Sequence, residues 1–183
     1  MNVEPVHEPS LIGQVIDGKY EVLGVLGKGG MAIVYEARDL HLGRRVALKI
    51  SVTGPRYSLQ REAQALAAVR HPGFATIYHV GSHGDAEYIA MERIFGETLA
   101  SHLDELTSKG RTMPLDDALD VLIGVADALS AAHRAGVAQR DLKPGNIILA
   151  GDRVVLVDFG LFIPEVLVSP ENEISGTPEY IAP

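Results

Sequence analysis

The stretch GVAQRDLKPGNIILAGDRVVLVDFG constrains the fold of this chain more than any other. Within it, Ile147 to Leu149 and Val154 to Val157 are short β-branched runs on either side of the turn Gly151-Asp152, which predicts a β-hairpin. A hairpin returns the chain on itself, so Asp158 is expected to lie beside Asn146. Their oxygens would suit a hard, octahedral cation such as Mg²⁺.

A glycine-rich turn is predicted near the amino end. The apolar run Tyr20 to Leu26 precedes the glycines of Gly27 to Gly30, and the β-branched and aromatic residues Ile33 to Tyr35 follow them. In a dinucleotide-binding fold the glycines would open a helix, whereas a strand is expected here. An ordinary hairpin turn stays an alternative. The functional interpretation is a loop that folds over a triphosphate and donates backbone N–H groups.

Three further strands and one helix complete the predicted first lobe. Strand alternation over Arg45 to Ile50 puts Ala47 and Lys49 on one face. The good helix formers of Leu59 to Val69 predict a helix that stops before His71-Pro72. Two alternating stretches predict the last strands of a five-stranded antiparallel sheet, at residues 75–80 and 87–91.

The second half of the sequence predicts helices. Residues 97–107 are expected to form a short helix, and apolar residues at three- and four-residue steps predict a longer one over 114–135. Gly136 stands at the position favoured at a helix C-terminus. We expect the longer helix to support the loop that carries Asp141, Lys143 and Asn146.

Composition excludes several classes of protein. Sixteen basic and 24 acidic residues give a net charge of −8 without a basic cluster, so no nucleic-acid surface is expected. The chain has no cysteine, which suits a reducing cytoplasm. It also has no apolar run long enough to span a bilayer, so no membrane contact is expected within these residues. Residues 1–15 are interpreted as a flexible lead-in.

The motif RDLKPGN followed by DFG resembles the catalytic loop and metal-binding motif of the eukaryotic-like protein kinases. The LKPGN variant, together with GKGGM, is similar to Ser/Thr kinases of the bacterial, Hanks type. The resemblance implies an α+β, bilobal protein-kinase-like fold, with the five-stranded sheet and one helix in the N-lobe. It also implies an N-lobe of about 16–91, a hinge of about 92–96 and a partial, mainly helical C-lobe over 97–183.

The resemblance also implies roles for the site residues. Asp141 would orient the substrate hydroxyl, Lys143 would neutralise the γ-phosphate, and Lys49, paired with Glu62, would hold the α- and β-phosphates. Mg²⁺ or Mn²⁺ would be held by Asn146 and Asp158. The residues expected around ATP are Leu26, Gly27, Lys28, Gly29, Gly30, Val34, Ala47, Lys49, Glu92, Ile94 and Ile148. Lys49 as a surface lysine and Glu62 as a solvated helix charge are the competing interpretations.

Residues 161–183 resemble an activation segment, in which Thr177 would contact the catalytic Asp and Lys. Arg140 is of the type that pairs with a phosphate on this segment. We therefore hypothesise that Ser169 or Ser175 is phosphorylated and docks on Arg140; unchanged activity after alanine replaces both serines would refute this. Two positions depart from the family pattern, with Gln139 in place of histidine and Ala32 in place of the third glycine.

The resemblance thus predicts ATP-dependent phosphorylation of Ser/Thr in protein substrates, including the kinase itself, with dimerisation for autophosphorylation left open. The chain ends one residue short of the glutamate that should follow Ala182-Pro183, so we expect a fragment of a longer kinase, inactive alone. Its parent could be anchored in a membrane through a later region. Two alternatives stay open: a pseudokinase or truncated nucleotide-binding regulatory module without transfer activity, and a small-molecule phosphotransferase.

Overall fold

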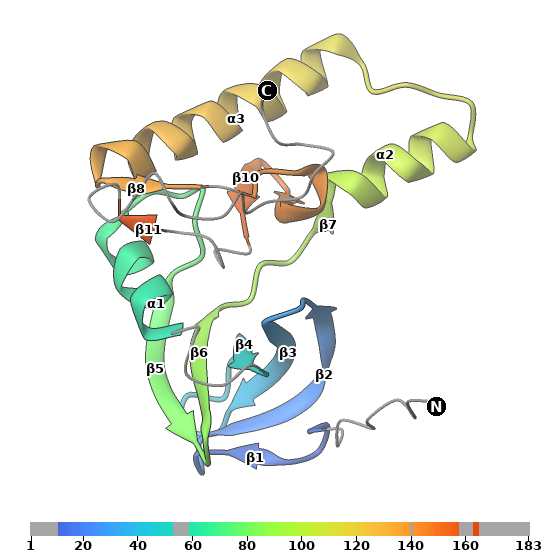
Figure 1. The fold of residues 1–183 in the computed structure, drawn as a ribbon. Helices are drawn as coiled ribbons and strands as arrows, with labels where there is room; N and C mark the ends of the chain where they lie inside the picture. The colour runs from blue at the N-terminus through green and yellow to red at the C-terminus, as the bar shows by residue number, and fades with distance from the viewer. Residues whose placement is uncertain (1–10, 53–58, 140, 158–162, 165–183) are drawn as a thin grey trace, which may run out of the picture.

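The computed structural model describes residues 11–52, 59–139, 141–157 and 163–164. They form an N-terminal lobe built on a β-sheet and a C-terminal lobe with two long helices (Figure 1). The segment 92–96, called the hinge below, connects the sheet to the C-terminal lobe. This is the two-lobed α+β arrangement that the sequence predicts.

The N-terminal lobe contains a six-stranded antiparallel sheet with the strand order β1-β2-β3-β4-β6-β5. The five long strands were predicted, and β1 adds a two-residue strand at the edge. The helix α1 (Leu59–Ala68) lies beside β5 and β6 (Figure 1). The strands are β1 (Val15–Ile16), β2 (Tyr20–Lys28), β3 (Ala32–Asp39), β4 (Arg45–Ser51), β5 (Ile77–His83) and β6 (Ala86–Glu92).

The central strand β4 is buried on both faces, because each face packs against a different cluster. Val46, Leu48 and Ile50 belong to a core that β2 and β3 share. On the other face Ala47 packs in one cluster with Leu59 of α1. All five residues from Val46 to Ile50 are therefore buried, and Lys49 is the only charged residue among them.

The fold begins earlier than the predicted boundary at residue 16. The N–H of Gly13 donates to the carbonyl of Val22 at 2.8 Å, and the N–H of Val22 donates to the carbonyl of Gln14 at 2.9 Å. These bonds fix residues 11–15 against β2, so they are not a flexible lead-in. Residues 1–10 lie outside the described residues.

The C-terminal lobe combines helices with short strands. Strands β10, β9 and β7 form a sheet in that order, and β11 pairs with β8. The elements are β7 (Glu97–Thr98), α2 (Leu99–Ser108), α3 (Leu115–Arg134), β8 (Val137–Ala138), the 3₁₀ turn η1 (Pro144–Asn146), β9 (Ile147–Ala150), β10 (Arg153–Leu156) and β11 (Ile163–Pro164).

The first predicted helix of this lobe starts two residues later than expected. Glu97 and Thr98 pair with β9, and the hydroxyl of Thr98 accepts the N–H of Ser101 at 3.1 Å as the N-cap of α2. An extended residue whose side chain bonds the first turn is the usual start of a helix. The polar residues at 97 and 98 therefore form a strand and a cap.

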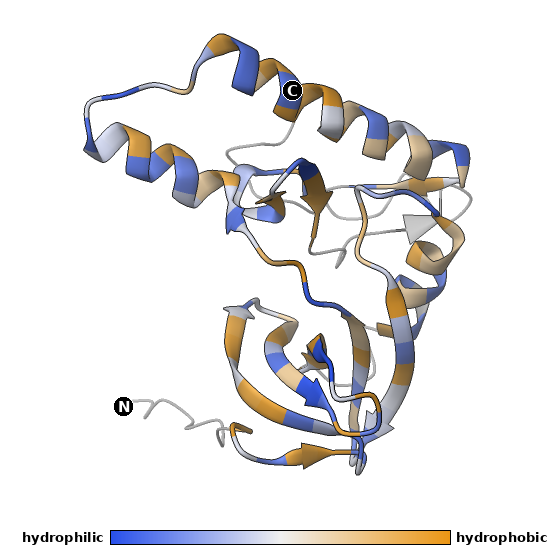
Figure 2. Cartoon of the chain, turned by 180° about the vertical axis from the view of Figure 1, so that it is seen from behind, coloured by the Kyte–Doolittle hydropathy of each residue, from blue (hydrophilic) through white to orange (hydrophobic). Residues whose placement is uncertain are grey.

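The long helix α3 ends as predicted. Gly136 has φ +70°, a left-handed conformation that glycine adopts without strain. The buried face of α3 consists of Val125, Ala128 and Ala132, and apolar and polar residues alternate along the helix in Figure 2. This face packs with Phe74 and with residues of β9 and β10. Within the described ranges, no helix is long and apolar enough to cross a membrane.

Candidate active site

The glycine-rich turn joins β2 to β3, as predicted. The N–H of Gly29 donates to the carbonyl of Ala32 at 2.9 Å and closes the turn. A Cβ placed on Gly27 or Gly30 would meet no atom within 4 Å. The loop backbone is therefore uncrowded at these positions, which leaves room for a ligand beside it. The methyl of Ala32 is buried, so this departure from the family pattern does not add a side chain to the exposed surface.

The expected pair of Lys49 and Glu62 is present. The Nζ of Lys49 on β4 lies 2.8 Å from Oε1 of Glu62 on α1, and the two side chains are 6% and 3% exposed. Both charges are thus removed from water, which is tolerated only when they are paired. This geometry rules out the interpretation of either residue as a solvated surface charge.

The apolar residues expected around adenine come from both lobes. Val34, Ala47 and Ile148 belong to one cluster, which also contains Ile94 of the hinge. Ile148 is on β9, so the C-terminal lobe supplies one wall of this cluster. Leu26 is not brought into it and is 39% exposed. Small-molecule sites are usually lined mainly by apolar side chains.

The hinge has polar contacts on both sides. The guanidinium of Arg93 contacts the carbonyl of Ile94 and lies over the ring of Phe95, 4.9 Å from its centroid. The N–H of Glu92 donates to the carbonyl of Thr76 at 2.8 Å. These contacts fix the hinge backbone where the resemblance places the adenine contacts.

The loop between β8 and β9 brings two predicted catalytic residues and one predicted metal ligand together. Oδ2 of Asp141 lies 2.7 Å from Nζ of Lys143. The Nδ2 of Asn146 donates to the backbone carbonyl of Asp141 at 2.8 Å and to its Oδ2 at 3.2 Å. The turn η1 is responsible for this arrangement, because the N–H of Asn146 bonds the carbonyl of Lys143 at 2.9 Å. A carboxylate, an ammonium group and an amide thus meet at one point.

The hairpin of β9 and β10 carries the predicted metal-binding side of this loop. Its register pairs Ile147 with Leu156, and the N–H of Val157 donates to the carbonyl of Asn146 at 2.9 Å. Val157, the residue before Asp158, therefore lies beside Asn146. Asp158 itself is outside the described residues, so its expected place beside Asn146 stays a prediction.

A divalent cation fits the chemistry of this loop. Because the Nδ2 of the buried Asn146 is directed at Asp141, its amide oxygen is the atom that can act as a ligand. Among the residues that the structure describes, no group of three His, Cys, Asp or Glu residues forms a metal site by itself. The predicted activation-segment residues, Arg140, Ser169, Ser175 and Thr177, all lie outside the described residues.

Gln139 occupies the position at which the family has histidine. Its Oε1 lies 3.5 Å from the N–H of Asp141, so it contacts the loop only at the limit of a hydrogen bond. Its Nε2 is buried and has no partner among the described residues. The glutamine therefore supports Asp141 weakly.

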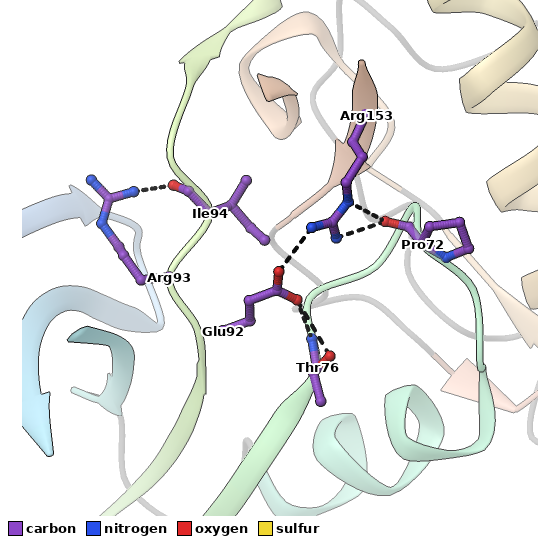
Figure 3. A network of polar contacts seen from close by, with 6 residues as sticks. All are labelled: Pro72, Thr76, Glu92, Arg93, Ile94 and Arg153. Carbon is purple, nitrogen blue, oxygen red and sulfur yellow. Dashed lines mark hydrogen bonds and ion pairs between the residues drawn. The ribbon is translucent and has the colours of Figure 1, made fainter. Parts of the chain in front are cut away.

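One polar network was not predicted from the sequence. The side chain of Glu92 bonds Thr76 and Arg153, and Arg153 also bonds the carbonyl of Pro72 (Figure 3). Glu92 and Arg153 are 61 residues apart, and neither belongs to a motif that would indicate this contact. No local sequence signal could have revealed it.

Comparisons with known proteins agree with this geometry. The family model described as "Protein kinase domain" matches residues 20–183. The PknI kinase domain of Mycobacterium tuberculosis has a similar structure, with a TM-score of 0.69 and 27% identity over 82% of this chain and 63% of that one.

Similar curated sequences are also bacterial. A probable serine/threonine-protein kinase of Streptomyces coelicolor is 35% identical over 97% of this chain, and the alignment covers 28% of that relative. The serine/threonine-protein kinase pkn2 of Myxococcus xanthus is 38% identical over 92% of this chain and 22% of its own length. The chain thus spans about a quarter of the length of these relatives.

Proposed function

Because this chain belongs to the protein kinase domain family, we propose that it carries the catalytic site of a protein serine/threonine kinase. The reaction transfers the γ-phosphate of ATP to Ser or Thr hydroxyls of protein substrates. The observation that carries this proposal is the meeting of Asp141, Lys143 and Asn146 within 3.2 Å on one loop. The relatives named above are serine/threonine kinases, which supports the substrate class.

In this proposal each residue of the loop has a separate task. The carboxylate of Asp141 accepts the proton of the substrate hydroxyl, an effect of about 10²- to 10⁴-fold for general-base catalysis. The ammonium of Lys143, 2.7 Å from that carboxylate, is close enough to stabilise charge on the phosphoryl group during transfer. The amide of Asn146 holds Asp141 in place through its two donated hydrogen bonds.

The rest of the site binds and orients the nucleotide. Lys49, held by Glu62, binds the α- and β-phosphates, and the backbone of residues 27–30 covers them. The adenine ring occupies the apolar cluster and contacts the backbone of Glu92 and Ile94. Asn146 and Asp158 would hold a Mg²⁺ or Mn²⁺ ion, which would supply positive charge next to the phosphates. We also propose a cytoplasmic location. ATP is available there, and a chain without cysteine is compatible with its reducing environment.

The test is phosphate transfer by the full-length natural protein. With Mg-ATP labelled at the γ-phosphate, label should enter protein, and Lys49→Met and Asp158→Asn should each abolish it. The matched control is Lys19→Met, which removes an exposed lysine paired with Asp17 in the N-terminal lobe and should leave transfer unchanged. Nucleotide binding without any transfer would favour the regulatory module instead. Label found only in small molecules would favour the small-molecule phosphotransferase.

A further inference from the structure

The side chain of Glu92 bonds Thr76 and Arg153, and so connects the first hinge residue to two other segments. Its Oε2 accepts hydrogen bonds from the N–H and the hydroxyl of Thr76, at 3.2 and 3.3 Å, and its Oε1 accepts one from Nη1 of Arg153 at 2.9 Å (Figure 3). The main chain of Glu92 bonds Thr76 as well. The first residue of the hinge is thus held by its backbone and by both carboxylate oxygens.

Arg153 connects this carboxylate to a second point. It lies on β10 of the C-terminal lobe, and its Nε and Nη2 donate to the carbonyl of Pro72 at 3.3 and 2.9 Å. One planar guanidinium therefore binds Glu92 with one nitrogen and Pro72 with the other two. A lysine ammonium has no such fork and cannot reproduce both contacts at once.

The loop that contains Pro72 is itself fixed to the C-terminal lobe. The N–H of Leu156 donates to the carbonyl of Gly73 at 2.9 Å, and Nε2 of His71 lies 3.0 Å from Oδ2 of Asp127 on α3. A Cβ on Gly73 would lie 2.6 Å from the Cβ of Ala128, so the loop and α3 are in close contact. Arg153 therefore joins the hinge to a part of the molecule that cannot move independently of the C-terminal lobe.

The charge on Glu92 supports the same contact. Partial burial acts to raise the pKa of Glu92, but the hydrogen bonds from Arg153 and Thr76 outweigh it and lower the pKa below its ordinary value. The carboxylate is consequently ionised at neutral pH, and its bond with Arg153 is charge-assisted. Such bonds are stronger than those between neutral groups.

We infer that Arg153 is a positioning residue that restrains the hinge through Glu92 and thereby slows the release of nucleotide from the site. Rotation of one lobe against the other about residues 92–96 has to break the contact between Arg153 and Glu92, because Arg153 is held on the opposite lobe. The slower release of nucleotide rests on the proposed function, whereas the restraint on the hinge does not.

Two measurements on the full-length protein test this inference. Amide hydrogen exchange of residues 92–96 without nucleotide reports the restraint, and stopped-flow dissociation of a fluorescent ADP analogue reports release. Arg153→Ala should accelerate both by about 10- to 100-fold, the range expected for losing one hydrogen bond between charged groups. Arg153→Lys should give an intermediate value. Glu92→Gln removes the charge and one of the two acceptor oxygens but keeps an oxygen that can accept from Arg153, so it should accelerate exchange less than Arg153→Ala.

The matched control is Arg38→Ala. Arg38 also pairs with a glutamate, Glu21, but both belong to the N-terminal lobe, so neither measurement should change. Unchanged hinge exchange in Arg153→Ala would overturn the inference. Equal acceleration in all parts of the chain would also overturn it, since Arg153 would then only stabilise the fold. If the wild-type protein binds no nucleotide, the proposed function fails, and the exchange experiment still decides whether the hinge is restrained.

Discussion

The Nζ of Lys49 and the Oε1 of Glu62 lie 2.8 Å apart, and the two side chains are 6% and 3% exposed. The pair joins the central strand β4 to α1 and is the charged contact between them. Two charges taken out of water have to be compensated by each other and by further hydrogen bonds. Removing one member of the pair therefore takes away the opposite charge that compensates the other at the contact between β4 and α1.

We predict that Lys49→Met and Glu62→Leu each lower the free energy of unfolding by about 3–5 kcal/mol, because each single change removes the opposite charge at 2.8 Å from a buried charge. The double variant should lose much less than the sum, since no charge remains buried. Urea unfolding of the four proteins measures this coupling. Arg38→Ala, which breaks an exposed pair, should change stability by less than about 1 kcal/mol. Additive losses in the double variant would show that the pair is not coupled.

The catalytic loop gives a second prediction. Asn146→Asp replaces the amide that donates to Asp141 by a carboxylate, so two acidic oxygens would lie about where the 3.2 Å hydrogen bond is now. Like charges at this distance raise the pKa of one of the acids. We expect phosphate transfer to fall by at least about tenfold and the acid side of its pH profile to move to higher pH. Steady-state rates across pH, at saturating Mg²⁺, measure both effects.

The control for that experiment lies on the same hairpin. Asp152→Asn changes one charge at the exposed turn between β9 and β10 and should leave the rate and its pH profile unchanged. An Asn146→Asp protein with the wild-type profile would mean that the amide of Asn146 does not set the state of Asp141.

Gly96 ends the hinge at a place where no side chain fits. A Cβ there would lie 2.2 Å from the carbonyl oxygen of Leu149 and 3.0 Å from Cγ2 of Ile148. Because the first of these atoms belongs to the backbone, Gly96→Ala has to displace the hinge from β9. We expect a loss of about 1–3 kcal/mol in thermal or urea unfolding. Gly24→Ala is the control, since a Cβ at Gly24 meets nothing within 4 Å; equal effects of the two variants would contradict the proposed clash.

The order of elements could be predicted because each has a local signal. The short apolar run around Lys49 indicates a strand, and the apolar steps from Leu115 to Leu129 show the helix period. The turns at Gly136 and Gly151 have the positive φ that favours glycine. The loop with Asp141 and Asn146 was predicted because its contiguous motif, RDLKPGN, resembles the catalytic loop of protein kinases. Each of these strands, helices and turns could therefore be predicted from a segment of about ten residues, without information from the rest of the chain.

Contacts between distant segments could not be predicted in this way. The sequence predicts only a backbone role for Glu92 in the hinge, and nothing in it distinguishes Arg153 from other charged residues of the hairpin. Their side chains nevertheless form a hydrogen bond with each other. The strand β1 and the turn at residues 11–14 are fixed by partners on β2, and Glu97 and Thr98 are extended because β9 lies beside them. In each case the partner lies elsewhere in the sequence, and periodicity carries no information about it.

Gln139 offers a prediction in the stabilising direction. Its Nε2 is buried without a partner among the described residues, and a buried donor without an acceptor costs about 1–3 kcal/mol. Gln139→Leu keeps the size of the side chain and removes that donor, so the free energy of unfolding should stay equal or rise by about 1 kcal/mol. Thermal unfolding measures the change. A clear loss of stability would mean that the amide of Gln139 has a partner that matters to the fold.

The ionisation of Glu92 predicts how stability depends on pH. Partial burial acts to raise its pKa, but the hydrogen bonds from Arg153 and Thr76 outweigh this effect, so the pKa in the folded protein is below the ordinary value of 4.5. A carboxylate whose pKa is lowered by folding adds stability that is fully present above its unfolded pKa and is lost as pH falls through the folded one. The stability difference between wild type and Glu92→Gln, measured by urea unfolding, should therefore be constant above about pH 5.5 and shrink below about pH 4.5. The contributions of the other carboxylates are the same in both proteins and cancel in this difference.

In an Arg153→Ala background the decline of this stability difference should be smaller, because one of the bonds that lower the pKa of Glu92 is gone. A stability difference that stays constant down to about pH 3.5 would show that the charge of Glu92 does not stabilise the hinge.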